Sequence, residues 1–541
     1  MNTWLEDLDP ADRGFLTWLS AVVRLPLDDL LQTIGVVAEA DRIRELDLSP
    51  LGPHIADRPR PLDPPFAGLD GLRRLDCSGL QLPKLDLRSL GPLRHLRCAD
   101  NALRELDVSA MSELESLDCS GNALMTLDLR GLGALRDVTC RENGLAMLLM
   151  DEAVTLHRLD ASSNQLMVLD LGAQPVLHEL WLARNALVSL KGSLPALEVL
   201  EASHNQLSRL DAAEWPALTT LSVAHNRLAA LDVPPTILQL EVGHNYLAAL
   251  NLAAASDLVH LAADHNQLVA VAWPRSNALV RVHVNGNRLS SLALGPGPTL
   301  VVTCDRNHLA LLDTTELPAL TKLSCTHNRL TLLDVRKNPN LVDLDLRNNP
   351  NLRTVDLTRN PWLTHLAVDA EGPRLIKADR ALYDIAVPDD ATPLEDLDTL
   401  SLHRAALAWW RSGRPEQLEA IVAHPRCDWG TAALLYWTHR PYRVRRDVDA
   451  SALEPFEVPT WRLVQAIEAR AQGDGFASRD CPFNPQHDTT TISVEGMDWT
   501  REGQADGVVV PPLLLEAIQP SGIGPQTRLP NATTSHRQET S

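Results

Sequence analysis

The 541-residue sequence is poor in aromatic residues, in basic residues and in long hydrophobic runs. Its 49 basic residues stand against 70 acidic ones, which gives a formal charge of -21. Because sequence-independent binding to nucleic acid or to an anionic membrane requires clustered Lys and Arg, we expect neither as a partner. The longest apolar runs, such as 508–515, are far shorter than the roughly 20 residues that span a bilayer. We therefore expect no transmembrane segment.

Aromatic residues are not only few but unevenly placed. They make up 4% of the chain, and between residues 72 and 366 the sequence contains only Trp181, Trp215, Tyr246, Trp273 and Trp362. A core of Leu, Val and Ala over so long a stretch indicates many thin, similar layers rather than one globular interior. The start of the chain is acidic and lacks the basic and apolar regions of a secretory signal, so we do not expect export through the general pathway.

Cysteine and asparagine recur with a fixed period. Cys77, Cys98, Cys119 and Cys140 are each 21 residues apart, and so are Cys304 and Cys325. A second series lies three residues further on, with spacings of 19 to 21 residues in its regular part: Asn101, Asn122, Asn143, Asn164, Asn185, Asn205, Asn226, Asn245, Asn266, Asn287, Asn307, Asn328 and Asn349. We interpret the Cys series as small hydrophobic side chains that face the core, in a protein of a reducing compartment.

One unit, residues 114–129, reads L-x-x-L-x-C-x-x-N-x-L-x-x-L-D-L. Alternating apolar residues predict a short strand with one inward face, and a buried Asn amide can bond the backbone groups of the turn that follows. The pattern resembles the leucine-rich repeat family over about 72–368. The resemblance implies an α/β solenoid, a leucine-rich repeat arc with a parallel sheet on its concave face.

The sequence on both sides of the repeat array predicts helices, linkers and a tail. Asp9 caps a first helix that begins at Pro10, and a second helix is expected over 27–43. After the array, helices are expected over 394–410, 415–424, 428–437 and 460–472. The predicted organisation is a helical cap at 1–49, a Pro-rich linker at 50–71, the repeat array at 72–368, an exit cap and linker at 369–393, a small helical domain at 394–499 and a disordered tail at 500–541.

Two further resemblances concern the C-terminal side. The late Asn-Pro pairs, at Asn338, Asn349 and Asn360, resemble the terminal repeats of bacterial internalins. The run His424-Pro-x-Cys427-Asp428-x-x-Thr-Ala resembles a small bacterial domain of uncharacterised function, which implies no activity.

The outward positions of the predicted strands supply the candidate binding residues. Trp181 places a large ring where small or charged residues are usual, and with neighbouring Arg158 and Arg184 it predicts a binding hot spot. Asp160 and Glu201 flank it. No base, nucleophile or oxyanion donor accompanies the recurring carboxylates, so we do not expect catalysis there.

A row of histidines is a second candidate. His204, His225, His244 and His265 precede the Asn of four consecutive units. At rungs about 5 Å apart, two imidazoles could share a metal ion, but we expect a solvated or partner-facing row. Protonation near pH 6 would make such a row repel itself, which predicts pH-dependent binding.

The C-terminal helical domain leaves two alternatives open. His424, Cys427, Cys481 and His487 could form a zinc site, and Cys427 could be a nucleophile activated by His424 or His439. Cys427-Asp428 has a passing similarity to the catalytic cysteine of bacterial effectors that join leucine-rich repeats to a ubiquitin-ligase domain.

The prediction favoured by the sequence is non-enzymatic. It is a cytoplasmic, bacterial scaffold without cofactors, whose concave face binds another protein that carries basic patches. Secretion as an effector, the identity of the partner and the oligomeric state stay open.

Overall fold

A computed structural model describes residues 5–39, 41–55, 64–150, 155–274, 278–360, 363–377, 393–409, 415–428, 431–432, 435 and 458–472. The chain divides into two compact units. The first comprises 1–299, 303–316 and 327–329, and the second comprises 300–302, 317–326 and the residues from 330 onward. No helix within the described ranges is both long and apolar enough to cross a membrane.

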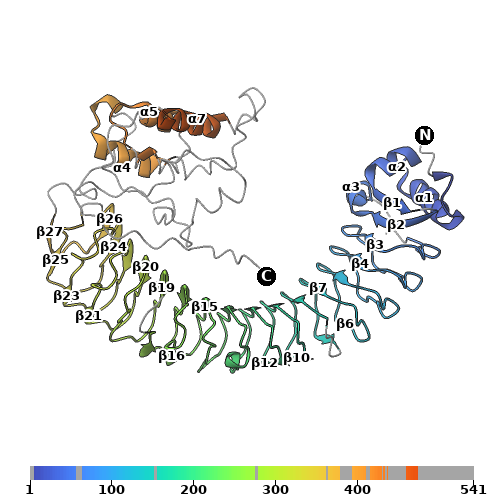
Figure 1. The fold of residues 1–541 in the computed structure, drawn as a ribbon, viewed down its shortest axis with the longest axis horizontal. Helices are drawn as coiled ribbons and strands as arrows, with labels where there is room; N and C mark the ends of the chain where they lie inside the picture. Colours follow the sequence, from blue (N-terminus) through green and yellow to red (C-terminus); the bar gives the residue numbers. More distant parts are fainter. Residues whose placement is uncertain are drawn as a thin grey trace, which may run out of the picture. The chain divides into compact units, whose positions relative to one another are not determined.

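The first unit begins with helix α1 (Pro10–Val23), as the sequence predicts. Asp9 accepts a hydrogen bond from Ala11 N at 2.8 Å, and the apolar face of α1 is buried. The predicted second helix over 27–43 is wrong beyond its first turns, because α2 (Leu27–Thr33) ends there and strands β1 (Gly35–Glu39) and β2 (Arg42–Asp47) form an antiparallel hairpin (Figure 1). The β-branched run Ile34-Gly-Val-Val favours a strand over a helix.

Strand β2 is also the first rung of the long parallel sheet. It pairs with β3 (Arg74–Asp76), with Leu46 opposite Leu75, so the sheet starts inside the segment predicted to be a helical cap. The buried carboxylate of Asp12 on α1 accepts from Ile43 N at 2.6 Å and from Arg42 Nε at 3.1 Å, which fastens the helix to this rung. A short 3-10 helix η2 (Ser49–Leu51) and α3 (Gly52–Ile55) follow.

From β3 onward, the long sheet consists of three-residue strands, each with an inward-facing central Leu or Val. In the first unit, neighbouring strands pair in parallel from β3 to β19 with these apolar residues in register. After β3, they are β4 (His95–Arg97), β5 (Ser116–Asp118), β7 (Asp137–Thr139), β9 (Arg158–Asp160), β11 (Glu179–Trp181), β13 (Val199–Glu201), β14 (Thr220–Ser222), β15 (Gln239–Glu241), β17 (His260–Ala262) and β19 (Arg281–His283). The later strands are β20 (Val301–Thr303), β22 (Lys322–Ser324), β24 (Asp343–Asp345) and β26 (His365–Ala367).

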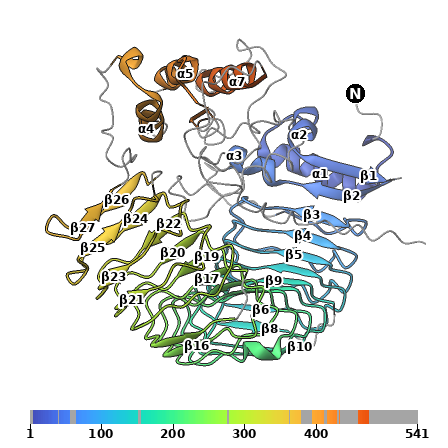
Figure 2. The ribbon, with the colours of Figure 1, turned by 60° about the vertical axis from the view of Figure 1, so that its left-hand side comes forward.

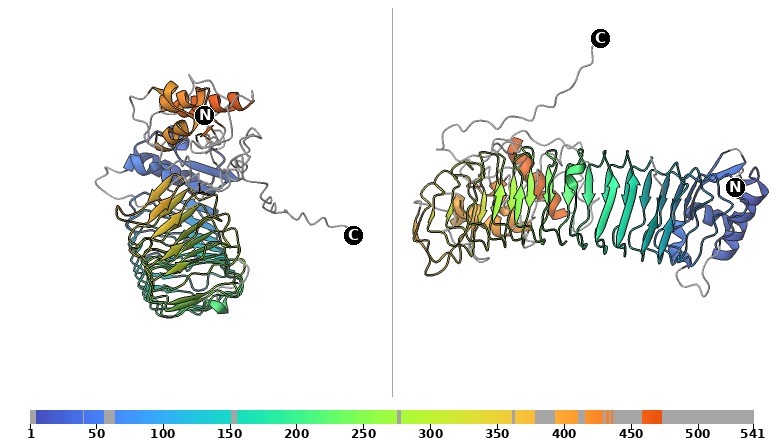
Figure 3. Two further views of the ribbon diagram at one scale, coloured as in Figure 1. Left: turned by 90° about the vertical axis from the view of Figure 1, so that its left-hand side faces the viewer. Right: turned by 90° about the horizontal axis from the view of Figure 1, so that it is seen from below.

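In several repeats, the second apolar segment forms a strand of a smaller sheet. These strands are β6 (Thr126–Asp128), β8 (Met147–Leu149), β10 (Val168–Ala173), β12 (Ser189–Ser193), β16 (Ala249–Asn251), β18 (Ala270–Ala272), β21 (Leu311–Leu312), β23 (Leu332–Leu333), β25 (Thr354–Asp356) and β27 (Arg374–Ile376). A 3-10 helix η3 (Ala212–Glu214) replaces such a strand in one repeat. In the first unit the long sheet lines the concave side and the small strands lie on the opposite side (Figures 1 and 3). The predicted solenoid is thereby confirmed.

Buried asparagines close the turns between the layers. Asn226 Nδ2 donates to the carbonyls of Ala202, Val223 and Ala224 at 2.9 to 3.3 Å, and its Oδ1 accepts from Leu207 N at 2.9 Å. Since Ala202 and Leu207 belong to the preceding repeat, each amide completes the turn before its own. The Cys77, Cys98, Cys119 and Cys140 thiols lie unpaired in the same core, as predicted.

The second unit carries the C-terminal helices. They are η5 (Leu394–Asp396), α4 (Thr399–Trp409), α5 (Pro415–Ala423) and α7 (Val458–Gln472), close to three of the four predicted ranges. The predicted helix over 428–437 and the predicted tail over 500–541 lie partly or wholly outside the described residues. Strand β27 falls within the predicted exit cap and pairs in parallel with β25.

Candidate functional site

The candidate site begins with the outward column formed by the third residue of each long strand. Trp181 on β11 pairs in register with Asp160 on β9 and with Glu201 on β13. The sequence prediction that these three side chains share one face is therefore correct in geometry. All three are half-buried.

The two carboxylates have a local structural role. Asp160 Oδ1 accepts from Ser162 N at 3.0 Å, and Glu201 Oε1 accepts from Ser203 N at 2.9 Å. Each bond closes the turn after its strand, as short polar side chains commonly do. The carboxylates therefore flank the indole with negative charge in fixed positions.

Contacts with neighbouring side chains hold the Trp181 indole. Its Nε1 donates to Glu179 Oε2 at 3.3 Å, and the guanidinium carbon of Arg158 lies 6.0 Å from the ring centroid. Arg158 also forms an ion pair with Glu179, with 3.5 Å between Nε and Oε2. A cation at this distance attracts the ring face weakly. The indole is thus a partly exposed aromatic side chain that is already oriented.

A second column lies at the turn that follows each long strand. Here the backbone adopts the left-handed conformation, with φ between 53° and 56° at Arg184, His204, His225, His244 and His265. The structure places Arg184 at the head of this series, one repeat before His204. We call His204, His225, His244 and His265 the His row.

The imidazoles of the His row are stacked. Ring centroids lie 4.2 Å apart for His204 and His225, 4.1 Å for His225 and His244, and 4.5 Å for His244 and His265. Partial burial, together with the charges of neighbouring imidazoles, lowers the pKa of His225 and of His244 below its usual value. The stack is therefore favoured in its neutral state.

Glycine ends the stack. Gly286 occupies the next turn position with φ of 64°, and a Cβ there would lie 2.7 Å from His265 Nδ1. Two further His pairs escaped the sequence prediction: His157 with His178, and His260 with His283, each with centroids 5.7 Å apart. The 21-residue spacing of the first pair is a signal that could have revealed it.

Three features define the repeat. Short parallel strands pair through their central Leu residues, small strands lie on the opposite side, and an Asn amide lies at every regular turn. The chain has the leucine-rich repeat fold.

Solved structures from three bacteria are similar to this chain. No protein-family model and no curated protein matches the chain. Among solved structures, it is similar to the functional domain of InlJ from Listeria monocytogenes, described as including a cysteine ladder, at 24% identity and a TM-score of 0.45. That alignment covers 56% of this chain and 63% of the InlJ chain, so the chain spans less than two thirds of that relative.

Two other bacterial structures are similar. The leucine-rich repeat protein LIC12759 from Leptospira interrogans has 22% identity and a TM-score of 0.46, over 56% of this chain and 84% of its own. YopM, a leucine-rich effector protein from Yersinia pestis, has 24% identity and a TM-score of 0.42, over 70% of this chain and 96% of its own.

Beyond the leucine-rich repeats, Cys427 lies in the core of the helical segment. Burial raises the pKa of its thiol to about 12, which makes the thiolate scarce at neutral pH. His424 Nδ1 accepts from Arg426 N at 3.1 Å, and buried His403 bonds Thr431 Oγ1 at 2.9 Å. Asp428 Oδ1 accepts from Thr431 N at 2.8 Å. The motif around Cys427 therefore has a structural role: Asp428 caps the turn that follows it, and Cys427 packs in the core.

The alternative of a zinc site involves residues that are only partly described. Cys481 and His487 lie outside the described residues, as does His439, the alternative base. Within the described part of the chain, no three residues of the His, Cys, Asp or Glu types gather closely enough to hold a metal ion.

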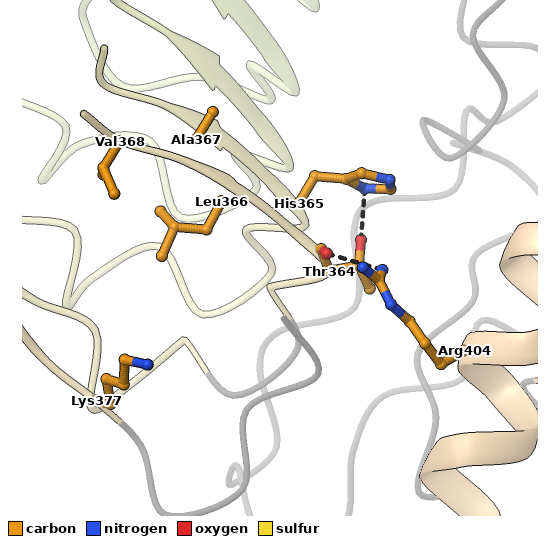
Figure 4. Close-up of a pocket in the computed structure, with 7 residues that line it drawn as sticks. All are labelled: Thr364, His365, Leu366, Ala367, Val368, Lys377 and Arg404. Carbon is orange, nitrogen blue, oxygen red and sulfur yellow. Dashed lines mark hydrogen bonds between the residues drawn. The ribbon is translucent and has the colours of Figure 1, made fainter. Parts of the chain in front are cut away.

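A small cavity borders the last strand of the long sheet (Figure 4). It has a volume of about 420 Å³ and is lined by β26, Lys377 and Arg404. Arg404 Nη1 donates to Thr364 O at 2.8 Å, and the Thr364 hydroxyl bonds His365 Nδ1 at 2.9 Å. Burial lowers the pKa of Arg404. This arginine, which sequence analysis missed, fastens α4 to β26.

Proposed function

We propose that the leucine-rich repeats form a non-enzymatic scaffold that binds another protein through the concave face of the long sheet. The observation that carries the proposal is the oriented, half-buried Trp181 indole between Asp160 and Glu201. Aromatic anchors beside arginine dominate the energetics of many interfaces. An anchor that is already oriented loses little conformational entropy on binding.

The chemistry around Trp181 favours a partner with basic patches. Asp160 and Glu201 place acidic side chains on either side of the indole, and the whole chain has a formal charge of -21. Opposite charge on the partner would accelerate association and set its orientation. The His row extends the same surface along the turns, so we include His204, His225, His244 and His265, together with Arg158 and Arg184, in the proposed interface.

The test is a pull-down with the full chain as bait, in lysate of the source organism, at several salt concentrations. We expect one partner to be captured by the wild type and lost, by about tenfold or more, with Trp181→Ala. Capture should also weaken as salt increases, because basic and acidic surfaces are screened. Tyr246→Ala is the matched control, since Tyr246 is an exposed aromatic side chain of the array outside the sheet face.

Cys427→Ala separates the scaffold from the enzymatic alternative. A scaffold holds its partner equally well with this substitution. Capture that ignores Trp181 but depends on the Cys427 thiol would contradict the scaffold and support an effector with a catalytic cysteine. The burial of Cys427 supports the scaffold.

We also propose that the protein works in the bacterial cytoplasm. The six cysteines of the array and Cys427 are buried thiols, a usage that fits a reducing compartment. No cofactor enters the proposal.

A further inference from the structure

An apolar patch covers four consecutive repeats of the first unit on the side of the small strands. It consists of Met125, Met147, Met167, Val168 and Val188, which are 67%, 51%, 61%, 57% and 43% exposed. These residues lie on or directly before β6, β8, β10 and β12. Figure 2 labels the first three of these strands. Contiguous exposed apolar surface of this kind marks interaction sites in soluble proteins.

Backbone bonds fix the patch as two columns. Ala146 N donates to Met125 O at 2.9 Å, and Val188 N donates to Met167 O at 2.9 Å, which aligns the first column. Thr126 pairs with Met147, and Val168 pairs with Ser189, which aligns the second. At about 4.8 Å per rung, four repeats make the patch about 20 Å long.

Charged residues bound the patch at both ends. In the second column, the repeat before it carries Glu105 and the repeat after it carries Arg209, and both are exposed. Arg209 forms an ion pair with Asp211, 3.0 Å between Nε and Oδ1, and its side chain remains 82% exposed. Along this column the order is therefore Glu105, Thr126, Met147, Val168, Ser189 and Arg209: acidic at one end, apolar at the centre and basic at the other.

We propose that this patch binds a second copy of the chain in an antiparallel, two-fold symmetric dimer. A two-fold axis that lies in the interface, at right angles to the direction of stacking, brings each column opposite itself in reverse order. Met147 then faces the partner's Val168, and Met125 faces the partner's Val188.

The same operation matches charges on both sides of the apolar block. Glu105 faces the partner's Arg209. In the next column, Asp128, which binds its own Arg130, faces the partner's Lys191. Asp107 and Asp211 would also face each other, and this like-charge contact opposes the dimer, although Asp211 forms an ion pair with its own Arg209 and Asp107 accepts a hydrogen bond from its own Ser109. A two-fold contact places the same patch of both copies face to face, so the patch must be complementary to itself. Opposite charges at the two ends of an apolar centre meet this condition.

The dimer would be weak. Two columns over about 20 Å cover less than the roughly 800 Å² per partner of a standard interface, so we expect a dissociation constant on the order of 10 to 100 µM. Because the small strands lie opposite the long sheet, the dimer leaves both sheet faces free. It would present two copies of the proposed binding surface, which increases avidity for a multivalent partner.

Sedimentation velocity of the full chain from about 1 to 200 µM tests the proposal. We expect a concentration-dependent dimer for the wild type and a dissociation constant at least about tenfold higher for Met147→Lys. Leu332→Lys is the matched control, since Leu332 is 60% exposed on small strand β23 outside the patch, and it should dimerise like the wild type. Circular dichroism establishes that each variant is folded.

Charge reversal then tests the antiparallel alignment. Glu105→Arg alone and Arg209→Glu alone should each weaken the dimer, and the double variant should restore it. A wild type that stays monomeric at 200 µM, or a dimer that Met147→Lys does not weaken, would overturn the proposal. Failure of the double variant to recover would overturn the antiparallel alignment. None of these outcomes depends on the pull-down with Trp181→Ala, so the two proposals can fail separately.

Discussion

At the scale of single residues, the asparagine amide is the group on which each repeat depends. Asn226→Ala removes three donated bonds and one accepted bond from buried backbone groups of two repeats. Because unpaired buried polar groups are costly, we expect a loss of about 3 kcal/mol in the free energy of unfolding, measured by urea denaturation and far-UV circular dichroism. Ser208→Ala, at an exposed position, is the control. Equal shifts for the two variants would contradict this role.

A second prediction at this scale concerns Cys427. Its buried thiol, with a pKa raised to about 12, should alkylate slowly in the native protein and rapidly in urea. Peptide mapping after a timed iodoacetamide pulse measures its rate apart from the other cysteines. Labelling of Cys427 in the native state as fast as that of a free thiol peptide would show a reactive cysteine and revive the catalytic alternative.

At the scale of the element, the His row predicts a pH dependence of stability. The pKa of His225 and of His244 is lowered in the folded state, so below pH 6.5 the folded protein binds fewer protons than the unfolded chain. Stability should therefore be constant above neutral pH and fall as the pH decreases through 6.5. The neighbouring carboxylate of Asp264 acts in the opposite direction on His244, since it raises the pKa of that imidazole.

Urea midpoints at pH 7.5 and 5.5 measure this dependence. The double variant His225→Asn with His244→Asn should lose less stability at low pH than the wild type, because Asn does not titrate and tolerates the left-handed backbone. If wild type and double variant lose stability equally, the stack is not the source of the pH dependence.

Elements differed in how far the sequence predicted them. The period identified the long strands, the buried Asn and the shared face of Asp160, Trp181 and Glu201, since each follows from a fixed spacing. The hairpin of β1 and β2 was missed because a short apolar run fits either a helix or a strand. The apolar patch was missed because single exposed apolar residues are common in soluble proteins, so the sequence does not distinguish Met125, Met147 and Met167 from ordinary surface residues. Ring stacking needed coordinates, since spacing does not give side-chain rotamers.

At the scale of the whole molecule, the two proposed surfaces occupy opposite sides of the same repeats. The sheet face carries an aromatic anchor among carboxylates, and the small strands carry the apolar patch. A repeat protein can separate functions in this way because each residue of the period is presented in its own column. Substitution in one column therefore leaves the other intact, which makes the Trp181 and Met147 variants independent probes.

The asparagine bonds also give the array a mechanical direction. Each amide completes the turn of the repeat before it, as Asn226 does for Leu207, so removal of a repeat from the C-terminal side leaves buried groups of its neighbour unpaired. Removal from the N-terminal side leaves the amide with the carbonyls of its own turn. Under tension, the array should therefore peel more readily from its N-terminal side, one repeat at a time. Each released repeat of 21 residues would lengthen the chain by up to about 70 Å.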